Sequence, residues 1–202
     1  MLITDLTNRI ERPPHIGQSG LDRSTNPKVP HVTEIIDRII VDLGMSGDAK
    51  RAGGFDDMPL TAEMGFVWEE ALQLAYGKRF TEIERPPEVT RDGIVGSPDG
   101  LSRKVKVVQE YKLKWVSCKN FDYMKQMKWQ MQAKSYCCLM GPGWRKVRYW
   151  VCFVMGDWGY GQDRKVGPEM RVFDVTFLDE ELRVHWDMMR KYRDTIVKER
   201  NK

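Results

Sequence analysis

The chain has 202 residues, of which 41% are hydrophobic and 31% are charged, and its formal net charge is +4. This composition is ordinary for a soluble globular protein, and the length is sufficient for one domain with a real hydrophobic core. No apolar run is long enough to span a membrane, so we expect no membrane association. The mildly basic balance permits an anionic partner without requiring one.

The N-terminal residues 1–14 contain acids and prolines where a secretory signal needs a basic start and an apolar block. We therefore expect a cytoplasmic protein, in the host cytoplasm if the chain is viral. The cysteines fit that compartment as small buried residues, because they lack the C-x2-C spacing of a metal or cluster site. They are Cys118, Cys137, Cys138 and Cys152.

The first 58 residues predict an irregular N-terminal arm. Residues 1–31 contain four of the ten prolines and little periodicity. Residues 33–43 predict a short helix with its isoleucines on one side, and residues 44–58, rich in glycine and charge, predict a mobile loop. In that loop Arg51 lies near two glycines and is a candidate phosphate contact, with a solvated loop as the alternative.

A core of helices and strands is expected from 59 to 202. Thr61 can cap a helix that runs to about Tyr76 and carries an apolar stripe at helical spacing. The stripe consists of Met64, Val67, Trp68, Ala71, Leu72 and Ala75. Two turn dipeptides, Asp92-Gly93 and Asp99-Gly100, then indicate tight reversals between strands.

The remaining pattern alternates between strand and helix. The order of elements predicts a mixed sheet flanked by helices, in a single α/β or α+β domain. The expected elements are a strand at 105–115, a helix at 120–139, strands at 146–155 and 170–177, and a final helix with Asp179 as its N-cap.

Glu110 and Lys112 lie two residues apart on the strand predicted at 105–115, so they project to one face. We expect Tyr111 and Leu113, on the other face, to hold the strand in the core. Taken alone, Glu-x-Lys is most simply an ion pair on an exposed sheet.

Asp99 changes that interpretation. A hairpin between its turn and the following strand would bring Asp99 and Glu110 to one end of the sheet. Two carboxylates so close repel each other unless a cation lies between them. A hard divalent ion such as Mg²⁺ is the natural occupant, and Lys112 would lie beside it as a fixed positive charge near a phosphate.

These residues resemble a known nuclease signature. Pro98-Asp99 followed by Glu110-Tyr111-Lys112 is similar to the PD-(D/E)xK motif, and the longer likeness, over residues 61–155, is to viral recombination exonucleases of the lambda-exonuclease (YqaJ) type. Four motifs occur in the order of that group: Gly65-x-x-x-Glu69, Ser97-Pro98-Asp99-Gly100, Glu110-x-Lys112 and Gln130-x-Gln132. Gln132 with Tyr136 also matches the Gln-x-x-x-Tyr pattern of RecB-like nucleases.

The resemblance implies a restriction-endonuclease-like core and a metal-dependent DNA exonuclease. By this likeness Asp99, Glu110 and the main-chain carbonyl of Tyr111 are metal ligands, and Glu69 helps to hold a second metal or an ordered water. Asp99 and Glu110 act in catalysis with Lys112, the catalytic lysine. Mg²⁺ is the expected cofactor, with Mn²⁺ as a substitute.

Substrate contacts are expected mainly from the helix at 120–139. Gln132 is implied to contact the metal-bound water or the DNA backbone, with Gln130 as the second choice, and Ser97 belongs to the turn motif. Lysines on this helix can neutralise phosphates and aromatics can stack on bases, but the aromatics could instead pack against the sheet. The face comprises Lys125, Lys128, Trp129, Gln132 and Tyr136.

The expected partner is DNA, at double-stranded ends processed for phage-type recombination. A single-strand annealing protein is a candidate companion, and a homo-oligomer is a candidate assembly. After the lysine the chain reads Leu113-Lys114-Trp115, where the group often has Cys-Pro. A site- or structure-specific endonuclease of the same superfamily and a catalytically silent DNA-binding recombination partner are the alternatives. Digestion polarity, strand preference and the number of metal ions stay open.

Overall fold

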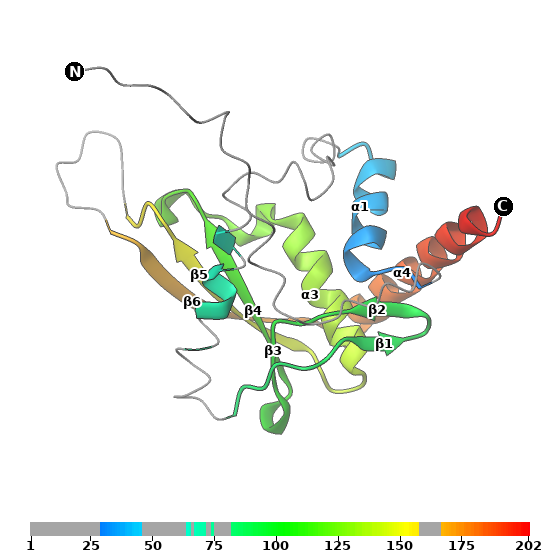
Figure 1. Ribbon diagram of the computed structural model, residues 1–202, viewed down its shortest axis with the longest axis horizontal. Helices are drawn as coiled ribbons and strands as arrows, with labels where there is room; N and C mark the ends of the chain where they lie inside the picture. The colour runs from blue at the N-terminus through cyan, green and yellow to red at the C-terminus, as the bar shows by residue number, and fades with distance from the viewer. Residues whose placement is uncertain (1–28, 46–63, 66, 72–73, 75–81, 158–166) are drawn as a thin grey trace, which may run out of the picture.

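A mixed four-stranded sheet forms the centre of the molecule (Figure 1). The computed structural model describes residues 29–45, 64–65, 67–71, 74, 82–157 and 167–202. The central pair of strands is parallel and both outer pairs are antiparallel, which confirms the predicted α/β class. In spatial order the strands are β3 (Gly100–Ser102), β4 (Val107–Lys114), β5 (Lys146–Phe153) and β6 (Glu169–Thr176).

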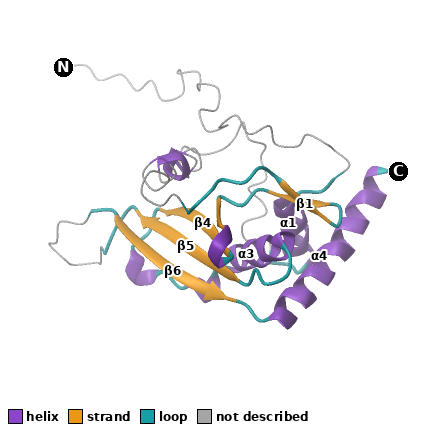
Figure 2. Ribbon diagram, turned by 90° about the horizontal axis from the view of Figure 1, so that it is seen from below, coloured by secondary structure: helices purple, strands orange, loops and turns teal. Residues whose placement is uncertain are grey.

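Three helices and a small hairpin pack together beside this sheet (Figures 1 and 2). Helix α3 connects the two parallel strands and contacts both of them, while α1 and α4 pack against α3. None of the helices in the described ranges is long and apolar enough to cross a lipid bilayer. The elements are α1 (Val32–Asp42), α3 (Met127–Met140), α4 (Asp179–Arg200), and the hairpin β1 (Val89–Arg91) and β2 (Ile94–Gly96).

The main core lies between the sheet and the helices. Helix α1 contributes four buried apolar residues to it, Val32, Ile35, Ile36 and Ile39. The short helix predicted at 33–43 is therefore part of the core. The four cysteines are buried with free thiols, as expected.

The two predicted turns behave differently. Asp92 and Gly93 have φ angles of 51° and 67° and close the β1–β2 hairpin, as the Asp-Gly pattern predicts. Asp99-Gly100 is not a hairpin turn, because Gly100 already begins β3. The reversal between β3 and β4 occurs instead through a 3-10 turn, η3 (Arg103–Val105), followed by Lys106 with a φ of 53°.

Helix boundaries also differ from the predictions. The helix expected at 120–139 begins only at Met127, because two 3-10 turns, η4 (Cys118–Asn120) and η5 (Tyr123–Lys125), precede it. Asp179 is the first residue of α4, not its N-cap. Leu178 occupies the cap position, and its N–H donates to the Glu181 carboxylate at 2.9 Å.

The apolar stripe predicted on the helix from Thr61 does not face the main core. Residues 64–65, 67–71 and 74 are helical, while Thr61, Leu72 and Ala75 lie outside the described residues. Met64 and Val67 are 41% and 44% exposed. Trp68 instead packs against a second, smaller cluster formed by Tyr111 and Trp150.

A buried polar chain ties three strands together. The Trp150 Nε1–H donates to the Gln109 side-chain oxygen at 2.8 Å, and Gln109 Nε2 donates to the Ser102 hydroxyl at 3.0 Å. These bonds join β5, β4 and β3 in sequence. Because a one-residue slip would move every side chain to the other face, they help to define the register that positions the site.

His185 on α4 predicts an acid-sensitive contact in the core. Its Nε2 lies 2.8 Å from the Ser135 hydroxyl of α3. Burial, and next the charge of Lys134, lowers the pKa of His185 from 6.5 to about 4. The unfolded chain therefore holds more protons between these values, so stability is full above pH 6.5 and falls as the pH drops towards 4.

We expect His185→Gln, which retains a hydrogen-bonding side chain, to remove this contribution. Between pH 7 and pH 5 the free energy of unfolding of the wild type should fall by about 2 kcal/mol more than that of the variant. Urea unfolding at both pH values measures the difference. Parallel pH dependence in the two proteins would contradict the assignment.

Candidate active site

The β3–β4 hairpin brings Asp99 to Glu110, as the sequence predicts. Gly100 pairs with Gln109, so Asp99 lies opposite Glu110 just beyond the end of β3. The Asp99 carboxylate accepts a hydrogen bond from the Tyr111 N–H at 2.8 Å. The N–H and C=O of one strand residue point to the same edge, so the Tyr111 carbonyl also faces Asp99.

Glu110 is the most deeply buried charge of the site, with 1% of its side chain exposed. The Lys112 side chain is 15% exposed, and its Nζ lies 2.7 Å from Glu110 Oε2. Apart from this contact with Lys112, neither carboxylate oxygen has a hydrogen-bond partner within the described part of the chain. Burying a carboxylate with so few partners costs free energy, and such a carboxylate is suited to bind a further positively charged ligand.

The faces of β4 divide differently from our expectation. Val108, on the face of Glu110, is buried in the main core beside Val147, so the acid emerges from the main core face itself. Tyr111 lies in the smaller cluster, and Leu113 is only half-buried. The reason is that helices cover the Glu110 face and anchor the strand there.

Glu69 joins the same electrostatic environment from the helix around residues 64–74. Its neighbour Trp68 packs against the Tyr111 cluster, which holds this helix close to β4. Burial, and then the charge of Asp99, raises the pKa of Glu69 to about 8. The same two causes raise the pKa of Glu110 to about 8. Three carboxylates are therefore close enough to repel one another.

Lys112 remains a cation at neutral pH. Burial by itself would lower its pKa, but the charges of Glu110, Asp99 and Glu69 outweigh burial and raise the pKa above its usual value. The lysine can therefore supply a positive charge and hydrogen-bond donors. It cannot accept a proton as a base near neutral pH.

Arg85 is a neighbour of the site that the sequence analysis missed. Glu84 and Leu101 exchange two main-chain hydrogen bonds, at 2.9 and 2.8 Å, which place this segment beside β3. The charge of Arg85 lowers the pKa of Glu69, although burial and the nearby acids have larger effects. No motif signals Arg85, because the bridge joins residues that are distant in sequence.

Gln132 and Tyr136 form a pair on α3. The Gln132 amide donates to the Tyr136 hydroxyl at 2.9 Å. The tyrosine is 2% exposed, so its ring packs in the core and is not available to stack on a base. Burial, and then the charges of Glu110 and Asp99, raises its pKa above the usual range, which places its hydroxyl near the acids. Tyr136 therefore positions Gln132 beside the site.

The other predicted substrate contacts are dispersed. Gln130 donates to the carbonyls of Tyr123 and Met124, both at 3.0 Å, and so stabilises η5. Ser97 is half-buried, and its hydroxyl donates to Glu88 at 3.4 Å. Arg51 lies outside the described residues.

Two residues of the helix surface that was predicted to face DNA make their contacts away from the acid cluster. Lys128 forms an ion pair with Asp37 of α1 at 2.6 Å, in a groove between helices. Trp129 stacks on Tyr149 in the aromatic part of the core, with ring centroids 5.8 Å apart. The aromatic half of that surface thus packs against the sheet, which was the alternative interpretation.

The ligands that meet at the site suit a hard divalent ion. They are carboxylate oxygens of Asp99 and Glu110 and the carbonyl of Tyr111, with one buried Glu110 oxygen lacking a partner among the described residues. The part of the chain that the structure describes contains no group of three or more His, Cys, Asp or Glu side chains arranged to hold a metal. Mg²⁺ in proteins usually binds few protein ligands and keeps several waters, so the residues fit that ion.

The hydrogen bond from Tyr111 N–H to Asp99 can be tested by paired substitutions. Asp99→Ala leaves this donor without an acceptor and should lower the free energy of unfolding by about 1–3 kcal/mol. Asp99→Asn retains an acceptor oxygen and should cost clearly less. Urea unfolding without divalent ions measures both, and equal losses would show that the bond does not stabilise the hairpin.

Comparisons with known proteins identify the fold. No protein-family model matches the chain, and no curated protein matches its sequence. The alkaline exonuclease of Laribacter hongkongensis superposes with a TM-score of 0.55 and 13% identity, over 87% of this chain and 91% of that chain. The same exonuclease in complex with dAMP gives 0.50 and 10%, over 85% and 89%. A phage-related exonuclease from Haemophilus somnus gives 0.49 and 14%, over 83% and 82%. The chain therefore shares the fold of the alkaline exonuclease, which confirms the predicted resemblance at the level of the fold.

Proposed function

We propose that the protein is a metal-dependent DNA exonuclease, which hydrolyses phosphodiester bonds at DNA ends. The observation that carries the proposal is the meeting of Asp99, Glu110 and Lys112 at the middle of β4, with the Glu110 carboxylate buried and incompletely paired. The fold shared with an alkaline exonuclease supports this function.

Asp99, Glu110 and the carbonyl of Tyr111 would hold Mg²⁺, for which Mn²⁺ would substitute. Glu69 would approach from its helix to bind a second ion or an ordered water. When bound, the ion lowers the pKa of a water and offsets negative charge on the phosphate.

The chain's own residues orient the substrate. The Lys112 ammonium, held by Glu110, is positioned to bind a phosphate oxygen and to offset the charge that develops during hydrolysis. Gln132, held by Tyr136, can donate to the attacking water or to the DNA backbone. The core behind Glu110 excludes water from one side, which strengthens these interactions.

The substrate class is proposed as double-stranded DNA ends, processed during phage-type recombination. A single-strand annealing protein and further copies of this chain are the proposed partners. The structure that is similar in fold and was determined with dAMP supports a nucleotide ligand.

Linear duplexes labelled at the 5′ or the 3′ end, together with covalently closed circular DNA, test this proposal. With Mg²⁺ we expect release of label from the linear DNA and no attack on the circle, since an exonuclease needs an end. Cleavage of the circle would instead indicate the endonuclease alternative. No hydrolysis of either would support a silent DNA-binding protein.

We expect Lys112→Ala to reduce hydrolysis by at least about 100-fold, because it removes the positive charge next to the phosphate. Lys146→Ala is the control, since Lys146 is exposed on β5 and pairs with Asp174. Loss of Lys112 also leaves Glu110 buried without its ion partner, so circular dichroism should first establish that the variant is folded. Undiminished hydrolysis by the folded variant would overturn the role of this lysine.

The metal assignment predicts that Asp99→Asn weakens Mg²⁺ binding by at least about tenfold, because it removes a charged ligand. Isothermal titration calorimetry without DNA measures this directly. Asp174→Asn is the control, since that aspartate pairs with Arg148 on the sheet surface. Equal affinities in the wild type and Asp99→Asn would exclude Asp99 as a ligand.

A further inference from the structure

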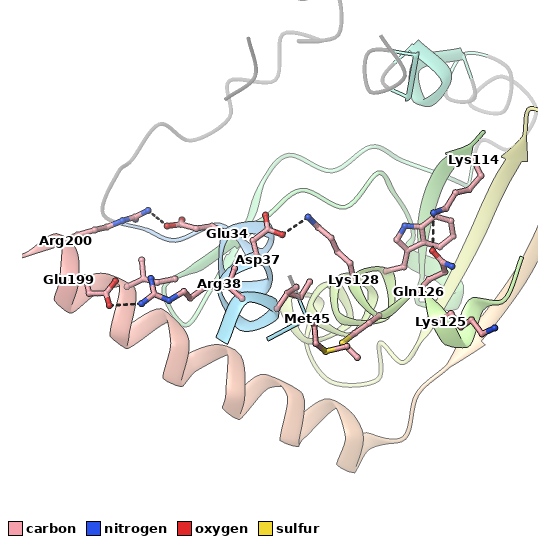
Figure 3. Close-up of a pocket in the computed structure, with 15 residues that line it drawn as sticks. Glu34, Asp37, Arg38, Met45, Lys114, Lys125, Gln126, Lys128, Glu199 and Arg200 are labelled. Atoms are coloured by element: carbon pink, nitrogen blue, oxygen red, sulfur yellow. Dashed lines mark hydrogen bonds and ion pairs between the residues drawn. The ribbon is translucent and has the colours of Figure 1, made fainter. Parts of the chain in front are cut away.

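A groove of about 850 Å³ lies between α1, the first turns of α3 and the C-terminal part of α4 (Figure 3). Its volume is within the roughly 300–1,000 Å³ of pockets that enclose small ligands. A space of this size is suited to part of one extended polymer strand.

The two ends of the groove differ in charge. Lys114, Lys125 and Gln126 lie at one end, and Figure 3 shows the Glu199 and Arg200 side chains at the other. At that far end, acids and arginines pair with one another, as in the contact of Arg38 with Glu199 at 3.0 Å. The lysine end therefore carries the excess of positive charge.

Two lysines of the groove, Lys125 and Lys128, can exchange their aspartate partners for an anionic ligand. Lys125 is exposed and lies 3.9 Å from Asp122, the long limit of an ion pair. Lys128 pairs with Asp37 at 2.6 Å, with both side chains about half exposed. Exposed ion pairs contribute little stability, so an anionic ligand can replace the aspartate at small cost.

The apolar part of the lining is exposed as well. Val41 and Met45 at the end of α1 and Met127 at the start of α3 line the groove and are exposed to solvent. Flexible methionine side chains adapt to flat apolar surfaces. Cations beside an apolar floor suit a chain of phosphates that carries bases.

Lys114 of β4 lines the groove and lies two residues from Lys112 of the proposed active site. Lys114 and Lys112 project to the same face of the strand, about 7 Å apart along it. Lys114 lines the groove, where it donates to Gln126 at 3.1 Å and lies over the Trp129 ring at 4.7 Å. A nucleic-acid strand bound at Lys112 would therefore have to extend only about 7 Å along β4 to reach Lys114, at the basic end of the groove.

We propose that this groove binds a single strand of nucleic acid, with its phosphates against Lys114, Lys125 and Lys128 and its bases against the apolar floor. The choice of ligand rests on the proposed nuclease function, because an acidic polypeptide would satisfy the same lysines. The position of Lys114, which lines the groove two residues from Lys112 on β4, favours the nucleic acid. The groove thereby directs one strand to or from the site.

Binding of a fluorescein-labelled dT12 oligonucleotide to the full chain tests the proposal. Fluorescence anisotropy in EDTA measures affinity without hydrolysis, over a range of salt concentrations. The double variant Lys125→Gln/Lys128→Gln removes two proposed phosphate contacts from exposed positions. Lys146→Gln is the matched control, because the Lys146 side chain is exposed to a similar extent as that of Lys128, is paired with an aspartate and lies outside the groove.

We expect the double variant to raise Kd at least about tenfold. The slope of log Kobs against log salt should shrink by about 0.7 for each lysine that contacts phosphate, or about 1.4 in total. The control should match the wild type, and thermal unfolding should establish that all three proteins are equally folded.

Unchanged affinity and slope in the double variant would overturn the inference. The inference would also be overturned if a poly-glutamate peptide binds more tightly than dT12 and the substitutions abolish only the binding of the peptide. The test is separate from the test of the nuclease proposal. If the wild type does not hydrolyse DNA but the double variant loses oligonucleotide binding, the groove is supported and the enzyme is rejected. If the wild type hydrolyses DNA but the double variant binds the oligonucleotide unchanged, the enzyme is supported and the groove is rejected.

Discussion

The structure depends on a carboxylate that is kept almost fully out of water. Among the described residues Lys112 is the ion partner of Glu110, and the two carboxylate oxygens have no further hydrogen-bond partner there. Replacing water around a carboxylate costs several kcal/mol, which one lysine offsets only in part. Burial first, and then the charge of Asp99, raises the pKa of Glu110 and of Glu69. Such a cluster does not by itself stabilise the fold, and the proposed chemistry would give a reason for its presence.

The surrounding fold tolerates this cost through rigid local anchors. The register of β3 on β4 brings the Asp99 carboxylate onto the Tyr111 N–H, and the buried chain of Gln109 and Trp150 holds the neighbouring strand. Trp68 attaches the helix of Glu69 to the same strand. Each acid is thus fixed by an uncharged neighbour.

The same strand connects the site to the groove. Lys112 and Lys114 alternate with Tyr111 and Leu113, so one face of β4 carries successive cations from the acid cluster to the start of α3. The excess of positive charge decreases along the groove, since the acids of α1 and α4 pair with arginines at its far end. This gradient would attract a polyanion to the end that adjoins the acids.

The sequence by itself determined the local features. Alternation predicted that Glu110 and Lys112 share a face, and the Asp92-Gly93 pair predicted a hairpin. The ordered motifs also predicted the fold that comparison with solved structures supports. These features depend on neighbours within a few residues, where the periodicity of strands and helices limits the possibilities.

Only the tertiary structure decided which face of each element is buried and which partners meet. It placed the Glu110 face of β4 on the main core, moved the turn after β3 away from Asp99, and brought Arg85 beside the site. It also assigned Tyr136 to the core, while Lys128 lines the groove. Periodicity favours the face of Tyr111 and Leu113, because the opposite face carries Glu110, Lys112 and Lys114. The choice follows from the helices that pack across the sheet, and these come from distant parts of the chain.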